Sequence, residues 1–351
     1  MTSLVIASAL LAVVVVAWQL LLVHGTNTNG WVVFTLDARS NMDGTVISRG
    51  ADAAVHDSYG GFLDMALSAD GREVMVIGSL GSQDQADQPN YGITLYSIPD
   101  GAMRSATAMQ KQRTPSTIFA SYSLASSNGS LYVETGGGRL GVETLVKYDV
   151  QRRLVVDTMD MAGCGQANLL DDPVAAWPHV LCWGAAELRT GSRRVALPPS
   201  AVAAVSSHGG SEVYIFSDAG SIYRFATRTA GDSSFALMAE THLPHGWVVS
   251  HTLLPASDRL AGNVLVGVAT NADASSGQFD EIWLIDPRAG ALAAPPIRRK
   301  GTSFTLTPDA SHVVIANSYT GRVTINNISS GAETTIESSA DSPVLAFGVK
   351  R

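Results

Sequence analysis

The sequence predicts an all-β fold, a seven-bladed β-propeller preceded by one N-terminal hydrophobic helix. Three observations predict it. Short alternating apolar runs, separated by Gly, Asp, Asn and Ser turns, follow one another after residue 25 without a long helical period. The starts of these groups recur at about forty to fifty residues, the spacing of a four-stranded blade. One hairpin sequence also occurs twice.

The repeated hairpin is "LSADGREVMVIGS" at residues 67–79 and "LTPDASHVVIANS" at residues 306–318. In each copy a strand ends near the first Leu, a tight turn around the Asp follows, and an alternating apolar run forms the next strand. We therefore expect two hairpins of the same design in two blades of one ring. The identical pairs are Leu67/Leu306, Asp70/Asp309, Val74/Val313 and Ser79/Ser318.

The first strands of the blades define the expected ring. An open ring would leave unpaired edges on its first and last blades, so the final run "VLAFGV" should pair with the N-terminal run "WVVFTL". Residues 26–351 are then one propeller domain. The first strands are expected near Phe62, Ile118, Gln166, Val202, Val249, Thr302 and Val344.

The N-terminus differs from the rest of the chain. Residues 4–23, "LVIASALLAVVVVAWQLLLV", contain no charge and have about the length that a helix needs to cross a bilayer. Residues 1–25 are therefore predicted to be a membrane anchor or a cleaved signal peptide, and both readings stay open. Either one, together with the cysteine pair considered next, predicts an exported domain.

Composition and cysteine content restrict the class of protein. Lys and Arg number 23 against 31 Asp and Glu, a net charge of −8, which argues against a nucleic-acid partner. Cys164 and Cys182 are the only cysteines, and their spacing matches no metal motif. In an exported domain such a pair predicts a disulfide, here expected within one blade; the alternative is two free buried thiols.

Candidate chemical motifs are weak. His242, His245 and His251 do not have a known zinc spacing, and no metal site is predicted. The stretch "TGGGRLG" at 135–141 lies between two strands with no helix after it, so it is interpreted as a turn rather than a phosphate loop.

The paired acidic residues also have ordinary explanations. Asp171 and Asp172 precede a proline and are expected to cap a turn, and Asp84 with Asp87 lies in a polar loop. No Ser-His-Asp or Cys-His arrangement can be nominated, so no catalytic residue is assigned to this chain.

Several stretches together resemble the heavy subunit of the quinoprotein amine dehydrogenases, the methylamine and aromatic amine dehydrogenases. "YGGFLDMALSADGREV" (59–74) resembles the family's Gly-Gly-Phe-Leu segment, and "DEIWLIDPRAGAL" (280–292) resembles its aromatic-amine branch. "HGW" (245–247) resembles the family's Gly-Gly-Trp, with His245 in place of the first Gly. "GRVTINNISSGAE" resembles the closing blade, and the cysteine pair falls where that family has an intrachain disulfide.

This resemblance implies a function and its partners. The heavy subunit is a periplasmic propeller that carries no cofactor. It supports a small cysteine-rich light chain whose tryptophan tryptophylquinone oxidises primary amines and passes electrons to a blue copper protein. Phe62 would line the substrate channel, and Gly60, Gly61 and Trp247 would contribute to the partner interface. The chain would then be the cofactor-free subunit of an oxidoreductase.

A propeller fold is compatible with two other functions. One is a stand-alone exported propeller that binds a protein or envelope component without redox activity. Phe62 is also equally well explained as a core residue at the start of a strand. A lactonase-like propeller enzyme is disfavoured, because those enzymes act in the cytoplasm and this chain is predicted to be exported. The oligomeric state, the amine and the electron acceptor are not predicted.

Overall fold

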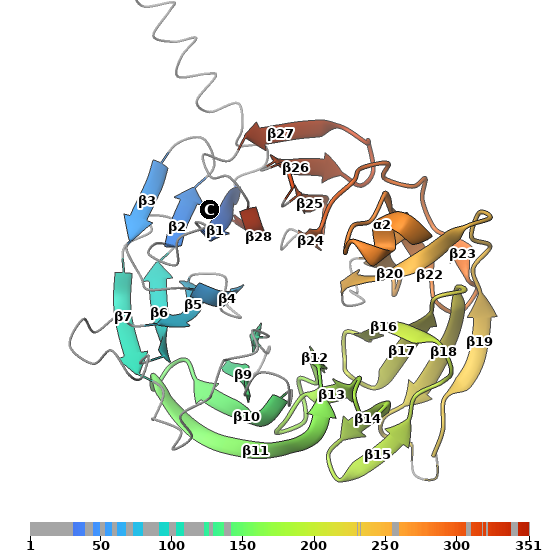
Figure 1. Cartoon of the computed structure of the whole chain (residues 1–351), viewed down its shortest axis with the longest axis horizontal. Coiled ribbons are helices and arrows are strands. Elements are labelled where there is room, and N and C mark those ends of the chain that lie inside the picture. Colours follow the sequence, from blue (N-terminus) through green and yellow to red (C-terminus); the bar gives the residue numbers. More distant parts are fainter. Residues whose placement is uncertain are drawn as a thin grey trace, which may run out of the picture.

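Seven four-stranded antiparallel sheets are arranged around a central opening (Figure 1). In each sheet the strand nearest the opening comes first along the chain, except in the sheet that closes the ring. The computed structural model describes residues 31–38, 45–49, 53–57, 62–67, 73–79, 91–97, 103–108, 123–125, 129–136, 142–229, 231, 233–254, 260–306, 310–317, 319–320, 322–337 and 343–350.

The first three sheets in chain order cover the N-terminal part of the ring. The closing sheet contains β28 (Pro343–Lys350), β1 (Trp31–Ala38), β2 (Thr45–Arg49) and β3 (Ala53–Asp57). The next contains β4 (Phe62–Leu67), β5 (Glu73–Ser79), β6 (Tyr91–Ser97) and β7 (Met103–Ala108). The third contains β8 (Ser123–Ala125), β9 (Ser130–Gly136), β10 (Val142–Asp149) and β11 (Leu154–Gly165).

Two sheets form the middle of the chain. One contains β12 (Ala167–Leu170), β13 (His179–Cys182), β14 (Glu187–Thr190) and β15 (Arg193–Ala196). The other contains β16 (Ala201–Ser206), β17 (Glu212–Ser217), β18 (Ser221–Ala226) and β19 (Ala236–Glu240).

The last two sheets include a short helix, α2 (Asn271–Ser275), between the second and third strands of the first of them. That sheet contains β20 (Trp247–Leu254), β21 (Val264–Thr270), β22 (Glu281–Asp286) and β23 (Ala291–Leu292). The other contains β24 (Ser303–Leu306), β25 (His312–Asn317), β26 (Arg322–Asn327) and β27 (Glu333–Glu337).

The repeated sequence forms the same hairpin in both places, as predicted. In the first copy Leu67 pairs with Val74 across β4 and β5. In the second copy Leu306 pairs with Val313 across β24 and β25. The shared residues therefore specify one strand register, which fixes the side chains that face each side of the sheet.

The ring closes between the two ends of the propeller sequence, also as predicted. β28 pairs with β1, with Phe347 opposite Phe34, so the C-terminal strand is the innermost strand of a sheet whose other three strands are N-terminal. This pairing removes the open edges that a linear array of blades would leave.

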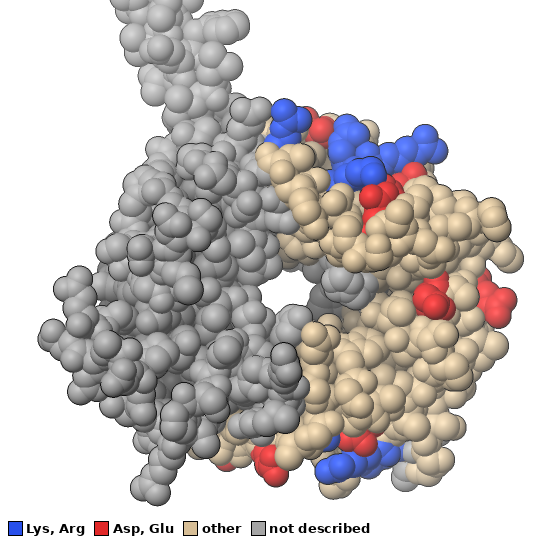
Figure 2. Space-filling view, in the orientation of Figure 1, with Lys and Arg blue, Asp and Glu red and all other residues tan. Residues whose placement is uncertain are grey.

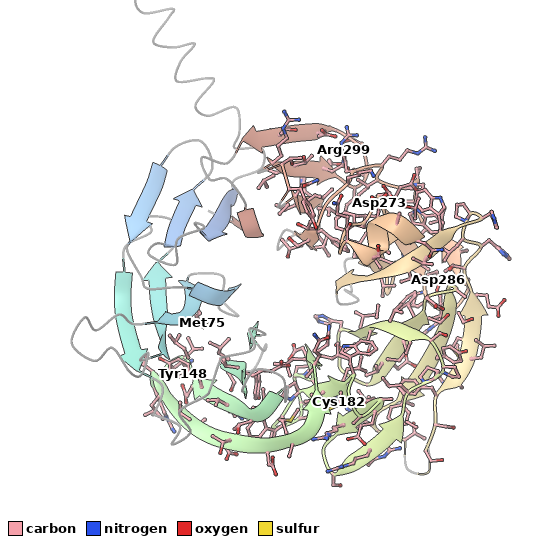
Figure 3. The ribbon with its side chains drawn as sticks, viewed as in Figure 1. Met75, Tyr148, Cys182, Asp273, Asp286 and Arg299 are labelled. Atoms are coloured by element: carbon pink, nitrogen blue, oxygen red, sulfur yellow. A yellow bond between two sulfur atoms is a disulfide. The ribbon has the colours of Figure 1, made fainter. Side chains whose placement is uncertain are left out.

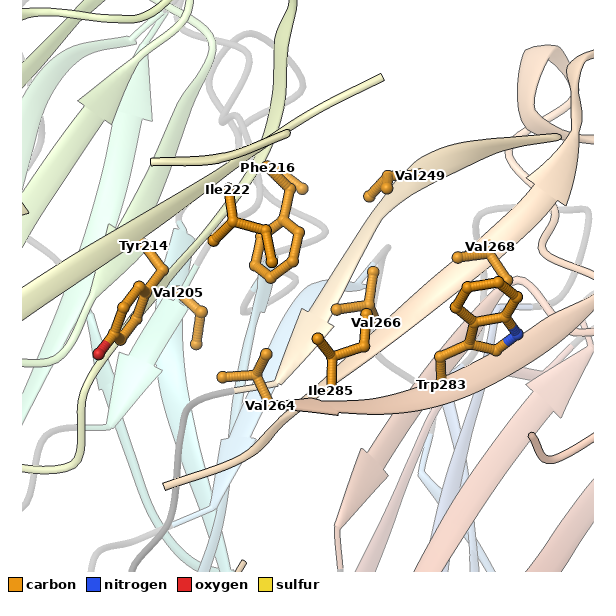
Figure 4. Packing of buried hydrophobic residues seen from close by; sticks show 11 residues of the cluster. Val205, Tyr214, Phe216, Ile222, Val249, Val264, Val266, Val268, Trp283 and Ile285 are labelled. Carbon is orange, nitrogen blue, oxygen red and sulfur yellow. The ribbon is translucent and has the colours of Figure 1, made fainter. Parts of the chain in front are cut away.

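The core lies between neighbouring blades, because each sheet is covered on both faces by its neighbours. β17 and β21 are therefore almost continuously buried instead of alternating. One buried cluster joins these two blades through residues such as Phe216, Val266 and Ile285 (Figure 4). Outermost strands such as β19 have exposed or half-buried residues throughout.

The predicted fold class, seven blades after an N-terminal helix, is corrected for the part of the chain whose side chains the structure largely describes: it contains five blades and no long helix. Five blades, from β8–β11 to β24–β27, are the sheets whose side-chain packing the structure largely describes; the other two sheets are defined mainly by backbone pairing. The expected N-terminal helix and the domain boundary after residue 25 fall outside the described residues. Among the residues that are described, no helix is long and apolar enough to span a membrane.

Candidate functional site: one face of the ring

The starts of the innermost strands lie on one face of the ring, which we call the α2 face. Trp247 begins β20 and pairs with Thr270, the residue that precedes α2. Phe62 begins β4, an innermost strand elsewhere in the ring. Because the innermost strands of a propeller run in the same direction, the predicted channel residue Phe62 and the predicted interface residue Trp247 belong to this face.

The innermost strands carry few charges. β12, β16, β20 and β24 contain no Asp, Glu, Lys or Arg; their sequences are ANLL, AVAAVS, WVVSHTLL and SFTL. Figure 2 shows the same distribution on the described side of the ring, where the charged side chains lie toward the outer rim and neutral residues border the central opening. The wall of the opening is therefore uncharged along these four strands.

Trp247 is held at the rim of this opening by local structure. Its backbone N–H donates to the Pro244 carbonyl at 3.0 Å, and its half-buried side chain packs against the cluster of Figure 4. The neighbouring Gly246 has φ +79°, a conformation that favours glycine, and its carbonyl accepts from the Asn271 N–H of α2. The turn before β20 thus ties the Trp247 backbone to the helix.

The segment that carries α2 is fixed by Lys300. The Lys300 ammonium lies 2.8 Å from Asp280 and 3.1 Å from Asp273, and Thr270 caps the helix. Hydrogen bonding to Asp280, then to Asp273, raises the pKa of Lys300, and the Lys300 hydrogen bond lowers the pKa of Asp273. These charges are paired with one another across two loops, which gives the α2 face a defined surface.

Tyr319 is a large exposed aromatic residue that no sequence pattern indicated. It lies in the β25–β26 turn, its side chain is 62% exposed, and its hydroxyl donates to the Ser276 carbonyl at 2.9 Å. Asn317 accepts from the Tyr319 N–H and orders the turn. Since Ser276 directly follows α2, the ring of Tyr319 is held against the α2 face while much of it remains accessible to solvent.

The predicted disulfide is present, but it does not lie within one blade. Cys164 is near the end of β11, the outermost strand of its blade, and Cys182 ends β13 of the next blade (Figure 3). The expectation failed because the register of β11 against β10 shifts between Asp160 and Gly165, and within this irregular stretch Cys164 packs against the next blade. The bond therefore joins neighbouring blades.

The backbone beside this disulfide is closely packed. Gly165 has φ +70°, and a Cβ atom on it would lie 2.8 Å from the Cα of Gly184. The Gly184 N–H donates to the Cys164 carbonyl at 2.9 Å. Glycine is needed at both positions, because a side chain on either one would separate the two blades at the bond.

Asp172 caps a turn, as predicted, and also contacts the next blade. Its carboxylate accepts from the Val174 and Ala175 N–H groups and pairs with Arg228 at 2.8 Å. The buried His179 ring lies 3.4 Å from the same carboxylate and 2.9 Å from the Gly210 carbonyl. Sequence spacing gave no signal of the contacts with Arg228 and Gly210, because these form only when adjacent blades pack.

The remaining predicted residues have these positions. Phe62 pairs with Gly78 at the start of β4, but its side chain, like that of His251, is not described. β9 and β10, which flank the glycine-rich stretch, pair as antiparallel strands, and residues 137–141 between them lie outside the described residues. His242 and His245 are exposed, and the described part of the chain holds no group of three or more possible metal ligands. Gly60, Gly61, Asp84 and Asp87 lie outside the described residues.

Comparison with known proteins supports the fold. No family model and no curated protein sequence matches the chain. A putative 6-phosphogluconolactonase from Bacteroides fragilis is similar in structure, with a TM-score of 0.61 at 13% identity over 92% of this chain and 99% of that one.

Two further solved structures are similar to this chain in fold at comparably low sequence identity. A protein from Lactobacillus plantarum has a TM-score of 0.57 at 12% identity, covering 92% of this chain and 100% of its own. A putative 6-phosphogluconolactonase from Bacteroides uniformis has a TM-score of 0.55 at 12% identity with the same coverage. At these identities the likeness defines a β-propeller and leaves the activity to be inferred from the residues.

Proposed function

We propose that this protein is a propeller scaffold that binds a partner protein on its α2 face. The observation that carries the proposal is the uncharged wall formed by β12, β16, β20 and β24, with Trp247 and the exposed Tyr319 on the same face. Interfaces between proteins are depleted of charge at their centre and enriched in Trp and Tyr, so this composition favours protein binding.

The proposed partner is a small cysteine-rich light chain that carries tryptophan tryptophylquinone, as the resemblance to amine dehydrogenase heavy chains implies. Two observations support this finer proposal. A disulfide joins the two cysteines that fall where that family has one. Phe62 and Trp247, which match its channel and interface segments, begin innermost strands on one face. A periplasmic location, with a blue copper protein as the electron acceptor, belongs to the same proposal.

The alternative is a stand-alone exported propeller that binds a protein or envelope component without redox activity. His245, which replaces the first glycine of the family's Gly-Gly-Trp segment and is exposed, favours it. An exposed imidazole beside Trp247 gives this part of the face a different chemistry from a glycine. The partner in this case need not carry a cofactor.

Co-expression tests the two proposals directly. The full chain would be produced alone and together with any small cysteine-rich chain encoded beside it, and amine-dependent dye reduction measured for both preparations. We expect the propeller alone to be colourless and inactive, and the complex to reduce dye. A stable complex without amine oxidation would support the stand-alone scaffold, and no binding by that chain would contradict the light-chain proposal.

Phe62→Ala provides a test of the channel role. If Phe62 lines the channel, the variant complex should change its preference among amines by about tenfold while the thermal midpoint of the propeller is unchanged. Loss of the folded state, followed by circular dichroism, would assign Phe62 to the core instead.

A further inference from the structure

A second site lies on the opposite face of the ring, at the seam between the blades β16–β19 and β20–β23. It is a pocket of about 350 Å³, within the size range of small-molecule sites. Its walls come from the loop before β17, the start of β17, the loop before β21, and the end of β22. The lining residues are Ser207, His208, Gly209, Ser211, Glu212, Tyr214, Ala261, Gly262, Asp286 and Arg288.

Glu212 lines this pocket, and its carboxylate is hydrogen-bonded to other side chains of the protein. Its carboxylate accepts from the Tyr214 hydroxyl at 2.5 Å and from Arg224 at 2.9 Å. Burial raises the pKa of Glu212, but these hydrogen bonds and the nearby guanidinium groups outweigh it, and the net pKa is lowered. The Tyr214 ring packs at the edge of the apolar cluster with its hydroxyl pointing away from it (Figure 4). The Glu212 carboxylate and the Tyr214 hydroxyl are therefore already engaged in hydrogen bonds within the protein.

Arg288 and Asp286 retain unused bonding capacity. The Arg288 side chain is 71% exposed and its ion pair to Glu212 is long, at 3.7 Å. One oxygen of Asp286 accepts the Arg288 backbone N–H at 2.9 Å, and within the described part of the chain the other oxygen has no hydrogen-bond partner. The pocket thus presents one cation and one carboxylate oxygen that a ligand can engage.

We propose that this pocket binds a small zwitterion, a free α-amino acid. The ligand carboxylate would pair with the Arg288 guanidinium, which suits bidentate recognition of a carboxylate, and its ammonium would donate to Asp286. A ligand with only one charge would form only one of these two ion pairs, so it should bind more weakly than a zwitterion. The pocket therefore selects for both charges in one small molecule.

Titration calorimetry on the full chain tests the proposal, with L-alanine as the probe and acetate and ethylammonium as single-charge analogues. We expect saturable binding of L-alanine and at least about tenfold weaker binding of each analogue, the effect of losing one charged hydrogen bond. Asp286→Asn keeps an oxygen for the Arg288 N–H and should weaken binding by about tenfold, as should Arg288→Ala.

Arg298→Ala is the matched control, because Arg298 is 82% exposed and pairs with Glu281 at the other end of β22. It should leave L-alanine binding unchanged, and circular dichroism would verify the fold of all three variants. Equal binding of acetate and L-alanine would replace the proposal with a simple anion site. Absence of saturable binding, or equal loss in the Arg298 variant, would overturn it. Because this pocket lies on the opposite face, its test is independent of partner binding on the α2 face.

Discussion

The disulfide between Cys164 and Cys182 joins the outermost strand of one blade to the second strand of the next. No described strand of one blade pairs with a strand of another, so side-chain packing provides much of the contact between neighbouring blades. A covalent bond at one seam limits the separation of those two blades in the unfolded chain as well as in the folded one. The oxidised protein should therefore be more stable than the reduced protein.

Removal of the disulfide should destabilise the propeller by about 3 kcal/mol, the loop-closure contribution expected for a loop of this length. Urea unfolding of the oxidised chain and of a Cys164→Ser, Cys182→Ser double variant would measure the difference. Addition of a thiol reductant should lower the urea midpoint of the wild type and leave that of the double variant unchanged. Equal midpoints for the oxidised and reduced wild type would contradict a stabilising role.

Gly165→Ala should destabilise the seam more than Gly163→Ala. Both glycines have positive φ, +70° and +77°, so both variants suffer the same kind of backbone strain. Only at position 165 would the new Cβ also collide with the backbone of Gly184, whereas nothing lies within 4 Å at position 163. We expect an additional loss of about 1–3 kcal/mol for Gly165→Ala in urea unfolding. Equal losses would show that the close approach is unimportant.

Glu212 should contribute pH-dependent stability. Its folded pKa lies below the ordinary value of 4.5, so its contribution is fully present above that pH and is lost as the pH falls through the folded value. Thermal midpoints measured from about pH 6 to about pH 3 should fall less steeply for Glu212→Gln than for the wild type. Parallel curves for the two proteins would argue against the Tyr214 and Arg224 hydrogen bonds as the source.

Much of the ring could be predicted from the sequence because its information is local. The repeat predicted two hairpins, and Leu67 with Val74 and Leu306 with Val313 pair in the same register. The need to cover sheet edges predicted the pairing of the two terminal strands. Alternating apolar runs and turn residues specify strands and hairpins, and such contacts lie close together in the chain.

The contacts between blades could not be predicted in the same way. Arg228 meets Asp172, and Tyr319 meets Ser276, only after separate blades have packed, and the sequence separations are 56 and 43 residues. The same limit explains the wrong assignment of the cysteines to one blade. A repeat period identifies which strands belong to a sheet, but it does not specify which side chains of neighbouring sheets come together.

A partner protein that binds on the α2 face should contact Tyr319, and the affinity of the purified partner for the Tyr319→Ala variant compared with the Leu237→Ala variant tests this binding most directly. Both side chains are exposed, at 62% and 56%, but Leu237 lies on the outermost strand β19. Neither variant should alter the free energy of unfolding by more than about 0.5 kcal/mol. We predict that Tyr319→Ala weakens binding by about tenfold or more and that Leu237→Ala leaves it unchanged. Unchanged affinity for Tyr319→Ala, or a loss confined to Leu237→Ala, would contradict binding on this face.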